Sequence, residues 1–253
     1  MIGPLESKVV VITGGGTGIG RAVASRAVSD GAAVVIGGRR RDVGEDAAAQ
    51  LRSGGGRALF IASDVTVEAD AKRLVDAAVT EFGQLNGAFN NAGGVNAAGP
   101  VHAIDDAAWR ADLEQNLVSV FYSLKFQIPA MLDSGGGSIV NNASTGGVRG
   151  IPGMSAYVAA KHGVVGLTRS AALEGAGRGV RVNALVTGNV DTPLYRTLLG
   201  APPDGELQGP APNPAGRVAS PDEIASFVAF LLGDESAFIT GAALAIDGGF
   251  TAQ

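Results

Sequence analysis

Ser144, Tyr157 and Lys161 form the part of the chain whose residue types and spacing could do chemistry. The tyrosine follows the serine by thirteen positions, and the lysine follows the tyrosine by four. Good helix formers and an apolar stripe predict a helix that begins near Ser155, and residues four apart share one helix face. A phenol has a reference pKa of about 10, which an ammonium group one turn away lowers by favouring the phenolate. We therefore expect Tyr157 to pass a proton to or from a substrate oxygen that the Ser144 hydroxyl polarises.

The composition excludes several kinds of partner. A formal charge of -5 and the lack of a basic stripe argue against nucleic acid. The chain has no cysteine, and His102 and His162 are far apart in the sequence, so we expect neither disulfides nor a metal site. No apolar run approaches the roughly 18 residues of a membrane span, and the first residues lack the features of a signal peptide. The expected protein is soluble and cytoplasmic, with a small molecule and not a membrane as its partner.

Short apolar runs alternate with segments of helical period along the chain, which predicts an α/β fold with a doubly wound parallel sheet. We expect strands at residues 8–13, 33–38, 58–62, 86–89, 180–185 and 242–246, and a further strand that leads to Ser144. We expect helices at residues 19–30, 42–52, 68–82, 105–131 and 221–232, besides the one from 155 onwards. The strands end in small or polar residues, and ligands bind at that edge of such sheets.

The first strand enters a glycine-rich turn, GGGTGIG, and then a helix. Backbone N–H groups and the helix dipole make such a turn a phosphate site, whereas the alternative interpretation is a flexible turn. The glycines match the pattern TGxxxGxG, with Thr13, Gly14, Gly18 and Gly20. They do not match GxGxxG, and the GxxxxGK[ST] loop is excluded because Arg21 follows Gly20.

The end of the second strand predicts which nicotinamide cofactor binds. The adenosine ribose lies near this point in dinucleotide-binding folds, and an acidic residue there binds the free ribose hydroxyls. Gly38 and Arg39 occupy the position instead, which favours a 2′-phosphate and hence NADP, with NAD as the alternative. We expect Arg40 and Arg41 to form a solvated loop, and a surface charge is also the alternative for Arg39.

Three later segments have compositions that indicate a function or an interface. Asparagine is disfavoured inside helices, so Asn116 needs either an exposed position or a use. The Pro- and Gly-rich segment of about 190–219 is expected to form a mobile lid inserted in a single catalytic domain that spans 1–253. Helix 221–232, with Ser220 as its cap, is apolar on nearly all sides, so we expect it to be buried, with a subunit interface as a reasonable place.

The ordered set TGGGTGIG, NNAG, Asn116, Ser144, YVAAK and ITGAALAIDGG resembles the classical short-chain dehydrogenase/reductase family over residues of about 6–250. The resemblance implies a Rossmann-like fold with a seven-stranded parallel sheet, a nicotinamide cofactor and a homotetramer. It implies Tyr157 as the proton donor and acceptor and Ser144 as the residue that orients the substrate oxygen. It implies that Lys161 lowers the Tyr157 pKa and holds the nicotinamide ribose, and that Asn116 holds a water linked to Lys161.

The same resemblance implies which residues contact the cofactor. The glycine turn would line the pyrophosphate, the residues after the third strand the adenine, the NNAG segment the adenosine side, and the start of the lid the nicotinamide carboxamide. Together with Arg39, the expected set is Gly14, Thr17, Gly18, Ile19, Gly20, Asp64, Val65, Asn91, Ala92, Gly93, Tyr157, Lys161, Gly188, Val190 and Thr192. Family members usually have Pro-Gly before the lid, where this chain has Thr187-Gly188, and we expect that departure to alter the lid entry and not cofactor binding.

The sequence therefore predicts an oxidoreductase that transfers a hydride between a nicotinamide cofactor and a ketone or secondary alcohol. Two alternatives stay open. A 3-oxoacyl-carrier-protein reductase would need basic contacts for its acidic carrier, which Leu173 and the stretch 131–137 lack. A non-catalytic, cofactor-binding sensor would have no need of the full set Asn116, Ser144, Tyr157 and Lys161.

Overall fold

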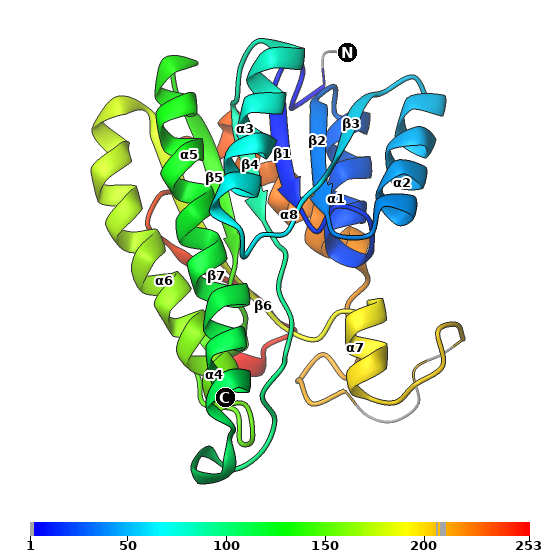
Figure 1. Ribbon diagram of the computed structural model, residues 1–253, viewed down its shortest axis with the longest axis vertical. Helices are drawn as coiled ribbons and strands as arrows, with labels where there is room; N and C mark the ends of the chain where they lie inside the picture. Colours follow the sequence, from blue (N-terminus) through cyan, green and yellow to red (C-terminus); the bar gives the residue numbers. More distant parts are fainter. Residues whose placement is uncertain (1–2, 206, 208–210) are drawn as a thin grey trace.

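The computed structural model describes residues 3–205, 207 and 211–253. Its centre is a seven-stranded parallel sheet in the order β3-β2-β1-β4-β5-β6-β7 (Figure 1). This arrangement confirms the expected Rossmann-like fold, and the strand order reverses between β1 and β4, where such sheets open a crevice for ligands. The strands are β1 (Val9–Thr13), β2 (Ala33–Gly38), β3 (Arg57–Ala62), β4 (Gly87–Asn90), β5 (Gly137–Asn142), β6 (Val180–Thr187) and β7 (Ala243–Ile246).

Helices cover both faces of the sheet, and the predicted bounds of strands and helices agree with the observed ones to within two residues. The one departure in kind is the predicted helix 105–131, which is divided by a π-helical turn at Glu114–Val118. The helices are α1 (Gly18–Ser29), α2 (Arg41–Ser53), α3 (Glu68–Phe82), α4 (Asp106–Leu113), α5 (Ser119–Asp133), α6 (Ser155–Gly175), α7 (Pro193–Leu198) and α8 (Pro221–Leu232).

Alternating side chains on the strands build two hydrophobic cores. On β1, Val10 and Ile12 pack into the core formed with α1, α2 and α8. Val9 and Val11 point the other way, into the core formed with α3, α5 and α6. A strand buried on both faces needs apolar residues at every position, which explains the unbroken run VVVI.

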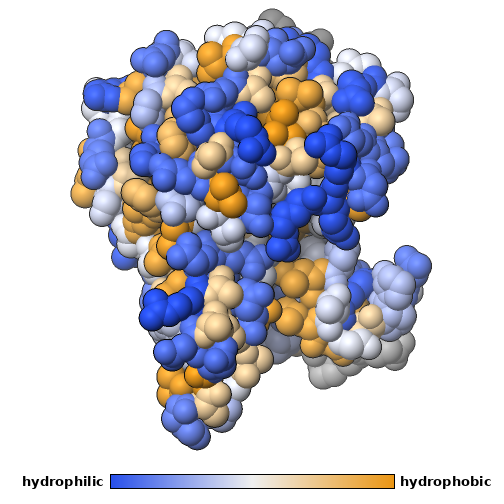
Figure 2. All heavy atoms as spheres, in the orientation of Figure 1, coloured by the Kyte–Doolittle hydropathy of each residue, from blue (hydrophilic) through white to orange (hydrophobic). Residues whose placement is uncertain are grey.

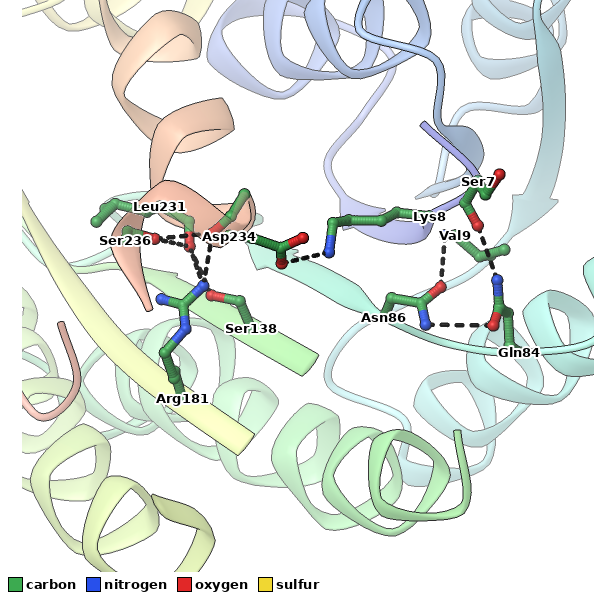
Figure 3. A network of polar contacts seen from close by, with 11 residues as sticks. Ser7, Lys8, Val9, Gln84, Asn86, Ser138, Arg181, Leu231, Asp234 and Ser236 are labelled. Atoms are coloured by element: carbon green, nitrogen blue, oxygen red, sulfur yellow. Dashed lines mark hydrogen bonds and ion pairs between the residues drawn. The ribbon is translucent and has the colours of Figure 1, made fainter. Parts of the chain in front are cut away.

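The amino ends of the strands are closed by polar contacts (Figure 3). The Arg181 guanidinium donates to the main-chain oxygens of Leu231 at 3.0 Å and Gly233 at 2.9 Å, at the end of α8. Ser138 also donates to the Leu231 oxygen, at 2.7 Å. The last carbonyls of a helix have no partner within it, so these donors complete α8 and fix it against β5 and β6.

The segment between β6 and α8 leaves the body of the molecule at the opposite, carboxyl edge of the sheet. There α7 and the described residues of the loop that follows it lie across from α4 (Figure 1). The two ends of the segment are pinned together, because Asp191 donates its N–H to the Ala219 oxygen at 2.9 Å and Ala219 donates to Asn189 at 3.0 Å. Within the described residues, no helix has the length and apolar character needed to cross a membrane.

Candidate active site

A cavity of about 690 Å³ opens at the carboxyl edge of the sheet, beside α7. The ends of β1, β4, β5 and β6 form its floor, α6 forms one side, and residues of the 190–219 segment cover it. Figure 2 shows apolar side chains gathered in the hollow beside α7. The cavity brings together Asn116, Ser144, Tyr157 and Lys161, which are spread over 46 positions of the sequence, from 116 to 161 counted inclusively.

Ser144, Tyr157 and Lys161 come from two adjoining elements. Ser144 follows β5 and caps a short 3-10 turn, where its Oγ accepts the N–H of Gly146 at 3.1 Å. Tyr157 and Lys161 lie in the first two turns of α6, and the Lys161 Nζ is 5.5 Å from the centre of the Tyr157 ring. Lys161 is only 4% exposed and donates to the main-chain oxygen of Asn142 at 2.8 Å. The predicted pairing of the phenol and the amine on one helix face is therefore confirmed.

Burial controls the protonation of both groups. Burial raises the pKa of Tyr157 above its ordinary value, while a hydrogen bond with Ser144 lowers it and the charge of Asp112 raises it further. Burial lowers the pKa of Lys161 to about 8. The expected net lowering of the Tyr157 pKa is therefore wrong, because the cost of taking the phenolate out of water exceeds the stabilisation that the hydrogen bond with Ser144 gives it.

Asn116 is fully buried at the π-helical turn between α4 and α5. Its Nδ2 donates to the oxygen of Asp112, four residues back, at 3.0 Å, and to the oxygen of Gly94 at 2.9 Å. Its Oδ1 accepts the N–H of Gly94 at 3.1 Å. An amide inserted into the ladder of helical hydrogen bonds is a recognised cause of such a widened turn. Asn116 is therefore not exposed: of the two alternatives for a mid-helix asparagine, the structure supports a buried side chain that makes specific hydrogen bonds.

The start of α1 has the properties of a phosphate site. Thr17 precedes the helix without capping it through its side chain, and the first turn contains no acidic residue, so its N–H groups stay available to an anion. Gly14 and Gly18 have φ angles of +67° and +53°, which favour glycine, and a Cβ on Gly18 would lie 3.1 Å from the Thr192 side chain. The residues present therefore fit the pyrophosphate of a dinucleotide.

Most of the expected cofactor-binding residues line this cavity, but four do not. Gly20 packs beneath the turn, where a Cβ would lie 2.3 Å from the Gly14 oxygen, so it is glycine because α1 approaches the turn closely and not because it faces a ligand. Arg39, Asp64 and Val65 lie beyond the cavity, at the ends of β2 and β3. The residues that line it are Gly14, Thr17, Gly18, Ile19, Asn91, Ala92, Gly93, Tyr157, Lys161, Gly188, Val190 and Thr192.

Arg39 is exposed at the end of β2, and its charge reaches Asp64. The pKa of Asp64 is lowered chiefly by the N–H of Thr66, against the effect of burial, with the Thr66 hydroxyl and then Arg39 as smaller causes. Asp64 accepts from the Thr66 N–H at 3.0 Å and from its hydroxyl at 2.8 Å. These contacts hold the Asp64 carboxylate within its own turn. Among the described residues, the guanidinium of Arg39 forms no ion pair.

Two residues near the site were missed by sequence reasoning. Asp112 is a fully buried carboxylate that accepts the N–H groups of Asn96 at 2.7 Å and Ala97 at 3.2 Å. Asn142, at the end of β5, accepts the Lys161 ammonium on its main-chain oxygen. The sequence held a signal for Asp112, because an acidic residue four positions before Asn116 shares a helix face with it. It held none for Asn142, because that contact depends on how β5 and α6 pack together.

Comparison with known proteins agrees with this geometry. A family model described as enoyl-(acyl carrier protein) reductase matches residues 14–251. Cyclohexanol dehydrogenase of Acinetobacter sp. strain SE19 is 38% identical, over 100% of this chain and 98% of that protein. 2-(S)-hydroxypropyl-CoM dehydrogenase 3 of Xanthobacter autotrophicus is 43% identical, over 98% of each chain. The crystal structure of levodione reductase superposes with a TM-score of 0.90 at 36% identity, over 98% of each chain.

The chain therefore belongs to the classical short-chain dehydrogenase/reductase family. It is an oxidoreductase that uses a nicotinamide cofactor, NAD or NADP, on a small-molecule substrate. Three features of the structure agree with this assignment: the order of the strands, the uncapped start of α1 and the shared cavity of Ser144, Tyr157 and Lys161.

Proposed function

We propose that the protein interconverts an uncharged cyclic secondary alcohol and its ketone, with NADP preferred to NAD. The observation that carries this proposal is the position of the Tyr157, Ser144 and Lys161 groups in the same cavity as a wall of apolar side chains. The NADP preference is supported by Arg39 at the end of β2, where an acidic residue would favour NAD.

The substrate end of the cavity supports the choice of an uncharged, compact molecule. Its wall comes from four separate parts of the chain and consists of Val95, Ala98, Ile151, Met154, Leu194, Leu198 and Phe250. Lys161 is the only lysine or arginine among the described lining residues, and its ammonium is committed to Asn142. A substrate with a carboxylate would therefore find no free cation, whereas a ring such as that of cyclohexanol, named in one relative, would bury its surface.

The proposed roles follow from where each polar atom lies. When bound, the nicotinamide ring supplies or accepts the hydride. Tyr157 gives a proton to the carbonyl oxygen during reduction and takes it from the alcohol during oxidation. Ser144 holds that oxygen through its hydroxyl, which lies close enough to the Tyr157 phenol to affect its pKa. Lys161 places a positive charge 5.5 Å from the Tyr157 ring and so favours the phenolate that oxidation requires.

Replacing Tyr157 by phenylalanine tests these roles. Loss of a positioned acid or base costs about a hundredfold to ten-thousandfold in rate, so Tyr157→Phe should lose nearly all turnover while it still binds NADPH. Tyr122→Phe, which changes a tyrosine of α5 outside the cavity, is the matched control. The assay panel contains cyclohexanol, a hydroxycyclohexanecarboxylate and a 3-oxoacyl thioester. Full activity of Tyr157→Phe, or preference for the carboxylate or the thioester, would contradict the proposal.

We propose further that residues of about 190–219 act as a lid and that the enzyme is a homotetramer. The lid is supported by Leu194, Leu198 and Asn213, which line the cavity from that segment. The oligomer is supported by Leu173 and Phe238, which are 85% and 104% exposed although apolar. Light scattering at assay concentration tests the second statement, and a monomer there would contradict it.

A further inference from the structure

A row of hydrogen-bonded side chains crosses the carboxyl edge of the sheet below the cavity. Thr187, at the end of β6, donates its hydroxyl to the Oδ1 of Asn142 at 2.6 Å. The Nδ2 of Asn142 donates to the Oδ1 of Asn91 at 3.0 Å, and the Nδ2 of Asn91 donates to the main-chain oxygen of Thr13 at 3.1 Å. The row therefore joins the ends of four strands, β6, β5, β4 and β1.

The direction of every bond in this row is determined by its last member. The main-chain oxygen of Thr13 can only accept, so Asn91 must present its NH₂ group there and its oxygen to Asn142. Asn142 must then present its own NH₂ group to Asn91 and its oxygen to Thr187. Because that oxygen can only accept, the Thr187 hydroxyl has to be the donor. A valine at this position would leave the Asn142 oxygen without its partner.

Asn142 connects this row to the catalytic lysine. Its main-chain oxygen accepts the Lys161 ammonium at 2.8 Å, and no other hydrogen bond of Nζ is formed with the described residues. A buried ammonium that keeps one protein acceptor depends on the position of that acceptor, because a hydrogen bond to the charged form favours the charged form. The Asn142 side chain accepts from Thr187 and donates to Asn91, which ties this residue of β5 to the ends of β6 and β4. These bonds restrict the movement of Asn142 and, with it, of its main-chain oxygen.

We propose that Thr187 is a positioning residue for Lys161: its hydroxyl orients the amide of Asn142, and thereby the main-chain oxygen that keeps the ammonium charged beside Tyr157. The inference rests on the proposed role of Lys161 in proton transfer. It gives the Thr187-Gly188 pair, which departs from the usual Pro-Gly of the family, a definite use at the floor of the site. Proline could not make this contact because it has no hydroxyl group.

Other titratable groups near Lys161 must be separated from this effect. Tyr157 lies on the same helix, and Asp112 faces the pair from α4. The remaining titratable groups that line the cavity are Tyr195 on α7 and Asp247 after β7. None of these makes a hydrogen bond to Thr187 or Asn142, so a change at Thr187 leaves their contacts in place.

The test compares Thr187→Val with Thr187→Ser, which restores the hydroxyl. The pKa of Lys161 is measured by NMR on side-chain-labelled lysine in the protein without added nucleotide, so that this readout does not depend on turnover. In Thr187→Val the pKa should fall, whereas Thr187→Ser should return it to the wild-type value. Alcohol oxidation by Thr187→Val should slow by about threefold to tenfold, the effect of one hydrogen bond. The rate of alcohol oxidation by Thr187→Val should begin to rise at a higher pH than that of the wild type, because a less charged lysine favours the phenolate less.

Thr168→Val is the matched control, because the Thr168 hydroxyl is also buried and accepts from Asn141, the neighbour of Asn142 in β5. It should lower the melting temperature without changing the pKa of Lys161. If Thr187→Val fails to fold, Asn142→Ala removes the same link from its other end and should lower that pKa in the same way. An unchanged Lys161 pKa in a folded Thr187→Val or Asn142→Ala protein would overturn the proposal. An inactive wild-type enzyme with every alcohol tested would instead count against the proposed function.

Discussion

Asn116 and Gly94 are joined by two hydrogen bonds. The N–H of Gly94 donates to the Oδ1 of Asn116 at 3.1 Å, and the Nδ2 of Asn116 donates to the main-chain oxygen of Gly94 at 2.9 Å. Gly94 belongs to the loop after β4 that lines the cavity, and Asn116 lies in the π-helical turn behind it. The widened turn therefore determines where the floor of the site lies relative to Lys161. A Cβ on the adjacent Gly93 would lie 2.7 Å from the Asn116 oxygen and 3.5 Å from the Lys161 Nζ.

Asn116→Ala should reduce both stability and turnover. It leaves the N–H and oxygen of Gly94 buried without partners, which costs about 1–3 kcal/mol. A displaced floor should lower kcat by about tenfold to a hundredfold. Denaturant unfolding and steady-state kinetics measure the two effects. Gln115→Ala is the control, since its amide bonds to the side chain of Asn96 and not to the loop main chain, and an equal loss there would contradict the special role of Asn116.

Arg39→Ala should narrow the preference for NADPH over NADH by about tenfold to a hundredfold, because it removes a charge-assisted hydrogen bond to the 2′-phosphate. The dissociation constants of both nucleotides, from fluorescence titration, measure the change. Arg41→Ala is the control, since Arg41 faces Glu45 at 3.8 Å on the solvent side of α2. Equal affinities of the unaltered protein for the two nucleotides would show that Arg39 is a surface charge.

Asp112→Asn should move the rise of alcohol oxidation with pH to lower pH. The carboxylate raises the pKa of Tyr157, so removing its charge lets the phenol ionise more easily. The new NH₂ group would also face the N–H donors of Asn96 and Ala97, which should loosen the loop and raise KM. Asp106→Asn removes an exposed charge from the same helix and serves as the control. A pH profile that does not move, or moves upward, would contradict the assigned effect of Asp112.

Lys161 should make the protein more stable as pH rises from about 8 to 10.5. Burial lowers the pKa of Lys161 to about 8 from an ordinary value of 10.5, so between these two values the unfolded chain binds more protons than the folded one. The contribution is therefore complete above pH 10.5 and is lost as pH falls to about 8, with a size on the order of 3 kcal/mol. Lys161→Met removes this dependence. Unfolding free energies of both proteins across that pH range measure it, and parallel curves would refute the assignment.

Local patterns were enough to predict the elements and most of the site. The spacing of Tyr157 and Lys161, the glycine turn before α1 and the apolar runs of the strands depend on residues close in sequence, whose geometry follows from helix and strand periods. The parallel sheet could be inferred because helical segments alternate with the strands along the chain and supply the crossover connections that parallel strands need. For these features the chain carries the information within a few turns or a single strand. The order of the strands comes from the structure alone.

Contacts between distant segments decided the rest. The direction of the Tyr157 pKa shift depends on how much water the packed cavity excludes, and no spacing of residues reports that burial. The π-helical turn exists because Asn116 meets Gly94 across 22 positions, and the link from Thr187 to Asn142 crosses 45. Gly20 is glycine because the start of α1 packs against the main chain of Gly14, a contact that exists only in the folded turn. The sequence alone thus determined which groups could react, and the tertiary structure decided which of them are buried, held and charged, since those properties come from neighbours that only folding brings together.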